Sequence, residues 1–145
     1  MSEVVVTRLI AASPETVFSF FSDVERWTSW QGVDGEIDAQ PGGVFRIVMP
    51  GAQVATGRFV ELIPAERIVF SWGWEGEGSP VPPGSTTVVV ELEEQDGGTL
   101  LRLTHGDLVP APNAEHHRRG WQRYLTRLQV RAEGGDPGVD VAEMP

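Results

Sequence analysis

The 145-residue sequence contains no cysteine and no lysine. The absence of cysteine excludes disulfides, thiolate metal ligands and cysteine nucleophiles. No apolar run approaches the roughly 18 residues that a membrane-spanning helix requires. The first residues also lack the basic start and apolar stretch of a secretory signal. We therefore expect a cytoplasmic protein with no membrane partner.

Positive charge is also scarce, because 11 arginines face 21 acidic residues and the net charge is -10. Such an acidic chain is repelled by nucleic-acid backbones, so we expect no nucleic-acid partner. Arg119, Arg123 and Arg127 repeat at four-residue spacing along one predicted helix face. We expect this row to face water; the alternative is that it binds an acidic partner.

The length and the 40% hydrophobic content fit one domain with a real core. We assign residues 1–132 to this domain. Residues 133–145 carry four acids, no bases and several glycines and prolines, and we expect them to form a tail.

Period-two alternation dominates the middle of the chain and short turns separate the alternating segments, which is typical of an antiparallel sheet. Ser13-Pro14-Glu15 is a helix-start signal, and a second short helical piece is expected at 23–30. Residues 75–85 are expected to form a long flexible loop. The predicted strands are 4–11, 44–49, 53–63, 67–74, 86–93 and 99–105.

The segment 113–132 is predicted to be a helix, and one stripe of it is apolar. Such a helix should cover the apolar face of the sheet. The expected fold class is therefore α+β: a curved antiparallel sheet of six or seven strands around a long C-terminal helix, with two short helices after the first strand. Gly120 is unusual inside a helix, and we expect it to allow close approach of a neighbouring group.

Aromatic side chains converge on the predicted space between sheet and helix. They can be core or can line a pocket for an apolar ligand, and both interpretations stay open. Trp27, Trp30 and Trp74 are expected nearest the mouth of such a pocket. The full set of candidate ligand-binding residues is Trp27, Trp30, Phe45, Arg46, Phe70, Trp72, Trp74, His105, His117, Trp121, Tyr124 and Leu125.

Two of these candidates, His105 and His117, are expected to face the same interior. They can be structural and hydrogen-bonded, or they can move protons or orient a polar ligand group. No carboxylate lies at a recognised metal-ligand spacing, and no phosphate loop, nucleophile elbow or dinucleotide fingerprint occurs. We therefore predict no metal and no cofactor, and assign no catalytic residue.

Several segments together resemble the family named after the activator of Hsp90 ATPase. They are Arg26–Trp30, Pro41–Ile47, Gly57–Pro64, Arg67–Trp72, Thr99–His105 and His117–Trp121, in the family's order and over nearly the whole domain. The resemblance implies a START-like, helix-grip fold of the polyketide-cyclase and birch-allergen superfamily. It also implies a cavity between the sheet and the long helix.

Three functions remain open at this point. The first is a domain that binds a small apolar or amphipathic molecule in the cavity. The second is an interaction module, similar to a co-chaperone, whose partner is a chaperone, a regulator or a second copy of the chain. The third is a cyclase- or hydrolase-like enzyme that uses a pocket histidine.

Overall fold

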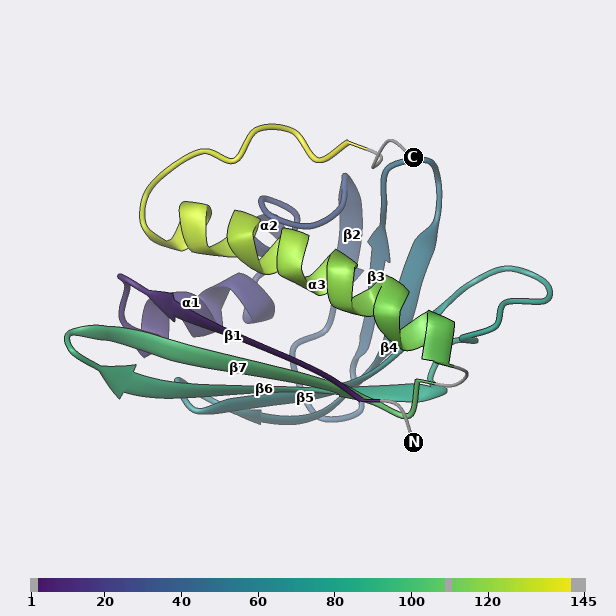
Figure 1. Ribbon diagram of the computed structural model, residues 1–145, viewed down its shortest axis with the longest axis horizontal. Helices are drawn as coiled ribbons and strands as arrows, with labels where there is room; N and C mark the ends of the chain where they lie inside the picture. The colour runs from purple at the N-terminus through teal and green to yellow at the C-terminus, as the bar shows by residue number, and fades with distance from the viewer. Residues whose placement is uncertain (1–2, 109–110, 142–145) are drawn as a thin grey trace.

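The structure, a computed structural model, describes residues 3–108 and 111–141. All neighbouring strands pair antiparallel, in the order β1-β7-β6-β5-β4-β3-β2, which confirms the predicted fold class. Figure 1 shows α3 lying across the concave side of this curved sheet. The elements are β1 (Val4–Ile10), α1 (Pro14–Ser22), α2 (Val24–Trp27), β2 (Asp34–Ile37), β3 (Val44–Val48), β4 (Val54–Ile63), β5 (Arg67–Trp74), β6 (Thr86–Gln95), β7 (Gly98–Gly106) and α3 (Ala111–Ala132).

The helix start and the hairpin turn predicted from the sequence have the expected local geometry. The hydroxyl of Ser13 caps α1 by accepting a hydrogen bond from the Thr16 amide (3.2 Å). Asp96 and Gly97 both adopt positive φ, as the tight turn between β6 and β7 requires. A register shift between Phe59 and Glu61 marks an irregularity in β4, and such irregularities bend a strand.

The edge strand β2 was not predicted. Its four residues alternate only between exposed and half-buried positions, so the sequence lacks the apolar alternation that identifies a strand. Pairing with β3, for example Gly35 with Ile47, defines it instead. The loop predicted at 75–85 exists, but it folds back on β5: the Trp74 amide donates to the Val81 carbonyl (2.7 Å), and Val81 is buried.

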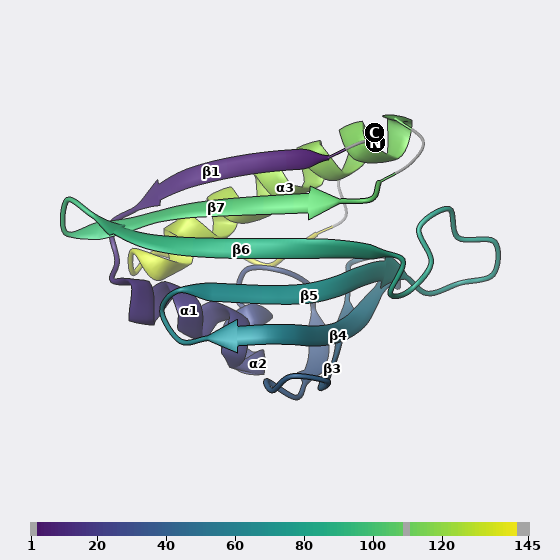
Figure 2. The same ribbon diagram turned by 90° about the horizontal axis from the view of Figure 1, so that it is seen from below.

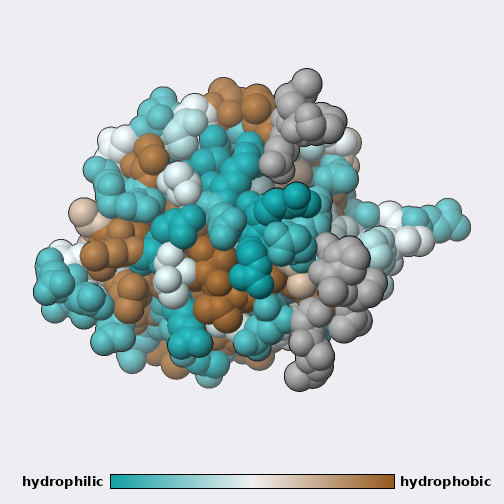
Figure 3. All heavy atoms as spheres, in the orientation of Figure 1, coloured by the Kyte–Doolittle hydropathy of each residue, from teal (hydrophilic) through white to brown (hydrophobic). Residues whose placement is uncertain are grey.

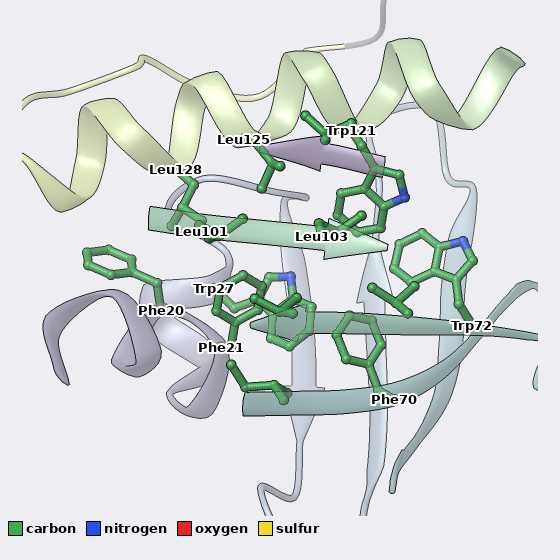
Figure 4. Packing of buried hydrophobic residues seen from close by; sticks show 14 of the residues in the cluster. Phe20, Phe21, Trp27, Phe70, Trp72, Leu101, Leu103, Trp121, Leu125 and Leu128 are labelled. Atoms are coloured by element: carbon green, nitrogen blue, oxygen red, sulfur yellow. The ribbon is translucent and has the colours of Figure 1, made fainter. Parts of the chain in front are cut away.

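The core lies between α3, the two short helices and the sheet (Figure 4). The predicted stripe of α3 faces this core. Of its members, Tyr124 is half-buried and the other five are buried: Ala114, His117, Trp121, Leu125 and Leu128. Because α3 also runs along β1 and β7 (Figure 2), Arg8 of β1 reaches the Gln122 carbonyl (3.1 Å). No helix among the described residues combines the length and apolarity needed to cross a membrane.

Of the arginine row of α3, Arg119 is exposed as expected, but Arg123 and Arg127 are half-buried and hydrogen-bonded, contrary to expectation. Arg127 donates to the carbonyls of Trp30 (2.9 Å), Pro137 (3.0 Å) and Gly138 (2.8 Å). The row therefore joins α3 to the residues that follow it, which run back over the helix (Figure 1). The face that carries these elements mixes hydrophilic and hydrophobic residues (Figure 3). One arginine can bind several carbonyls at once because its guanidinium group has five N–H donors. The carbonyls that Arg127 binds lie in loops, outside the helices and strands.

Candidate functional site

A pocket of about 700 Å³ opens at one end of the space between α3 and the sheet. Its wall is aromatic, and it is formed by Trp72 and Trp74 of β5 with Trp121 and Tyr124 of α3. Met49, at the end of β3, adds a flexible apolar side chain. The remaining polar side chains of the lining are Gln31, Gln53, His116, His117, Arg119 and Arg123. The pocket therefore combines flat apolar surface with polar groups, as small-molecule sites do.

Trp72 is the most informative residue of this wall. Its side chain is 2% exposed, and its indole Nε1 has no hydrogen-bond partner within the described part of the chain. Figure 4 shows this nitrogen at the edge of the ring that faces α3 rather than the sheet. A buried donor left unpaired costs roughly 1–3 kcal/mol, so it requires an explanation.

His105 lies behind Trp121 and is fully buried. The Trp121 indole donates to His105 Nδ1 (2.9 Å), so His105 carries its proton on Nε2. That nitrogen faces the Thr86 hydroxyl (2.8 Å), which in turn donates to the Trp72 carbonyl (2.8 Å). Both ring nitrogens are satisfied, and burial together with the neighbouring His117 lowers the pKa of His105 from 6.5 to about 3.

His117 lies at the pocket, one helical turn before Trp121, and its ring centroid is 5.1 Å from that of His105. The Trp74 indole donates to His117 Nε2 (3.0 Å), and the other ring nitrogen, Nδ1, lies 2.7 Å from the Asn113 carbonyl. Burial lowers the pKa of His117, although the Asn113 carbonyl opposes this effect. The two histidines do converge, as predicted, and both are held neutral with their nitrogens engaged.

This arrangement favours binding over proton transfer. A general base needs a ring nitrogen that can reach the substrate, and indole N–H groups occupy one nitrogen on each ring. The histidines instead fix the two indoles in place, which makes the aromatic wall rigid. Among the described residues, no three histidine or acidic side chains gather as a metal site.

Of the twelve predicted residues, the structure brings Trp72, Trp74, His117, Trp121 and Tyr124 to the pocket. Arg46 lies elsewhere, in an exposed ion pair with Glu75 (2.8 Å) whose hydrogen bond raises the pKa of Arg46. The other six are completely buried and do not line the pocket: Trp27, Trp30, Phe45, Phe70, His105 and Leu125.

Trp27 and Trp30 thus do not lie at a pocket mouth. Their rings are nearly parallel, with centroids 5.9 Å apart, inside the closed aromatic core. Their indoles donate to the Gln31 side chain (2.8 Å) and to the Phe20 carbonyl (3.1 Å). Because both N–H groups have partners within α1 and the α2–β2 loop, both rings can be buried without a ligand.

The explanation predicted for Gly120 is wrong. A Cβ built on Gly120 meets nothing within 4 Å, so no neighbouring group requires its absence. Gly120 instead forms part of the pocket lining. The missing side chain leaves the pocket wider at this turn of α3.

Sequence reasoning missed one buried carboxylate, that of Asp140. Its oxygens accept hydrogen bonds from Arg123 (2.8 Å) and from the Tyr124 hydroxyl (2.9 Å), two side chains of the pocket lining. Burial and the adjacent Asp140 raise the pKa of Tyr124 to about 12. Asp140 belongs to the predicted tail, of which residues 142–145 lie outside the described part. The only sequence signal was an arginine row able to hold a carboxylate.

Comparison with known proteins gives consistent matches. The family profile described as "Activator of Hsp90 ATPase homolog 1-like protein" matches residues 11–133. The human and mouse proteins named "Activator of 90 kDa heat shock protein ATPase homolog 1" are each 30% identical over 113 residues. That alignment covers 77% of this chain but 31% of the relatives, so the chain corresponds to about a third of their length.

Two solved structures extend the comparison. The solution structure of an AHSA1-like protein from Rhizobium etli is 43% identical, with a TM-score of 0.71 over 94% of this chain and 86% of that one. The solution structure of the Aha1 dimer from Colwellia psychrerythraea is 21% identical, with a TM-score of 0.80 over 95% and 100% of the two chains. The chain therefore belongs to the activator of Hsp90 ATPase homolog 1-like family.

Proposed function

We propose that this domain binds a small, flat, amphipathic molecule in the pocket between α3 and β5. The observation that carries the proposal is the buried, unpartnered indole N–H of Trp72 in the pocket wall. A ligand with a hydrogen-bond acceptor would satisfy this donor, while its apolar part packs against the wall that Trp72, Trp74, Trp121 and Tyr124 form. The Trp72 and Trp121 rings are in contact with each other, 5.1 Å apart from centroid to centroid, so this wall is continuous from β5 to α3.

The volume and rigidity of the pocket agree with this proposal. About 700 Å³ lies within the usual range for small-molecule sites. The Trp74 and Trp121 indoles are each anchored by a histidine, so little conformational entropy is lost when a ligand packs against them.

Native mass spectrometry of the purified protein, followed by thermal-shift measurements against fatty acids, sterols, flavonoids and polyketide-like aromatics, tests the proposal. We expect a retained adduct or a rise in Tm with one chemical class. Trp72→Phe should weaken that effect by removing the donor, whereas Trp30→Phe, a core control whose indole is bonded to the Phe20 carbonyl, should preserve it. An apo mass with no thermal shift from any class would overturn the proposal.

A second candidate function is protein interaction, supported by the 30% identity to relatives named as ATPase activators and by a structural neighbour described as a dimer. Arg119 is exposed at the pocket rim and would face an acidic partner. Pull-downs tested across salt concentrations, with Arg119→Glu as the variant, examine this function. Binding that is lost with this substitution and with salt would support it.

A further inference from the structure

The segment that follows α3, residues 133–141, is fastened along the helix by Arg123, Arg127 and Arg131; we call it the C-terminal strap. Arg131 contacts the Gly135 carbonyl and the Asp136 carboxylate, and Arg127 donates to the next two carbonyls, of Pro137 and Gly138. Arg123, at the far end of the strap, donates to the Asp140 carboxylate and the Val141 carbonyl. Successive arginines four residues apart therefore hold successive parts of the strap.

The far end of the strap is Asp140, whose side chain is 1% exposed. One carboxylate oxygen accepts from Arg123 Nη2 (2.8 Å), and the other accepts from the Tyr124 hydroxyl (2.9 Å) and the Gly32 amide (2.8 Å). Gly32 has φ +85°, and a Cβ there would collide with Ile47, so glycine is required at this position. Three donors from two distant parts of the chain thus converge on one carboxylate.

Two of these donors, Arg123 and Tyr124, belong to the lining of the proposed ligand pocket, and so does Val141, the strap residue next to Asp140. The third donor, the Gly32 amide, lies on the other side of the Asp140 carboxylate, where Gly32 and Asp140 line a second hollow. Burial disfavours the charge on Arg123, but its hydrogen bonds to Asp140 and Tyr124 and the charge of Asp140 raise the pKa of Arg123. A permanently charged donor at the end of an aromatic pocket is suited to a carboxylate attached to an apolar ring.

We propose that Arg123, Tyr124 and the Gly32 amide form the anion-binding end of the pocket, and that Asp140 fills it as an internal ligand which an aromatic carboxylate displaces. The inference rests on the proposed function, because the aromatic part of such a ligand would occupy the pocket beside Trp72 and Trp121.

The attachment of the strap suits it to displacement. Asp140 is its only buried residue within 133–141, and its apolar side chains Val139 and Val141 are 81% and 62% exposed. Polar contacts therefore hold the strap. The carboxylate of an incoming ligand can accept the same hydrogen bonds that the Asp140 carboxylate accepts from Arg123, Tyr124 and the Gly32 amide. Because Asp140 occupies the anion-binding end of the pocket most of the time, it lowers the apparent affinity of a free carboxylate ligand for that site.

The test uses 2-naphthoate and its uncharged methyl ester, titrated against the full chain by quenching of tryptophan fluorescence. Asp140→Ala should empty the anion site and tighten 2-naphthoate binding roughly ten- to hundredfold, as expected for one or more hydrogen bonds to a charged group. Affinity for the ester should change little. Arg127→Gln, which loosens the strap without touching the anion site, should also favour 2-naphthoate. Arg123→Gln should remove the preference for the acid.

Hydrogen exchange and circular dichroism accompany each titration. Asp140→Ala should lose protection of the Gly32 amide, which donates to the Asp140 carboxylate, while the helix and sheet keep theirs. If the acid and the ester bind equally to the native protein and to both strap variants, the inference is wrong and the proposed function stands. If neither probe binds any variant that keeps its fold, this inference fails for aromatic carboxylates, and the ligand panel described above decides the proposed function separately.

Discussion

The indole of Trp121 on α3 donates a 2.9 Å hydrogen bond to Nδ1 of His105 on β7, and both side chains are buried. This bond joins the long helix to the sheet at the point where the closed core ends and the pocket begins. Trp121 therefore belongs both to the core cluster and to the pocket lining.

Trp121→Ala should destabilise the fold by roughly 3–5 kcal/mol, because it removes a large buried side chain and leaves His105 without its donor. Urea unfolding followed by circular dichroism measures the change. Arg119→Ala, an exposed position two residues earlier on α3, is the control and should have little effect. A loss below about 1 kcal/mol for Trp121→Ala would mean that α3 does not depend on this contact.

Acid should destabilise the protein through His105. Its pKa is about 3 in the fold against 6.5 for an unperturbed histidine, so the unfolded chain binds the extra proton between these pH values. Stability is then complete above pH 6.5 and falls with decreasing pH by about 1.4 kcal/mol per pH unit. His117, whose pKa is also lowered, adds a contribution of the same sign.

His105→Gln isolates this effect, since glutamine does not titrate. Denaturant unfolding between pH 4.5 and 7.5 should give a flatter curve for the variant, even if it is less stable at neutral pH. Carboxylates titrate in both proteins, so the difference between the two curves reports His105. Parallel curves would show that His105 is not held neutral in the fold.

The fold and part of the site could be predicted because local periodicity determines them. Strand alternation placed Trp72 and Trp74 on one face, and helical spacing placed His117 and Trp121 opposite them; the structure brings these four together. Side-chain direction follows from backbone geometry, so a correct assignment of elements was sufficient.

The rest depends on contacts between distant parts of the chain. Trp27 was predicted near the pocket mouth, but its indole is paired with Gln31 inside the core, and sequence spacing does not reveal that depth. Asp140 looked like one acid of a solvated tail until the arginines of α3 provided its partners. Arg123 and Asp140 are 17 positions apart in the sequence, and no periodic pattern indicates that they pair.

Trp72→Phe should destabilise the unliganded protein only by the cavity that the smaller ring leaves, because the donor that it removes has no partner in the described structure. Trp27→Phe removes an indole that donates to Gln31 and should cost about 0.5–1.5 kcal/mol more, from the lost hydrogen bond. Parallel urea denaturation curves compare the two variants. A greater loss for Trp72→Phe would indicate that its indole is already satisfied without a ligand.

Gly120→Ala should stabilise the unliganded protein by about 1 kcal/mol, because Gly120 lies inside α3 and a Cβ there meets open space. Gly73→Ala is the matched control: its Cβ would overlap the Pro82 carbonyl oxygen, so that variant should be less stable. Gly120→Leu, which extends further into the pocket, should weaken binding of methyl 2-naphthoate without unfolding the helix. Thermal unfolding and fluorescence titration measure the two effects. If Gly120→Ala were destabilising, α3 would have to pack closely at that turn, and the open pocket beside Trp121 would not exist in solution.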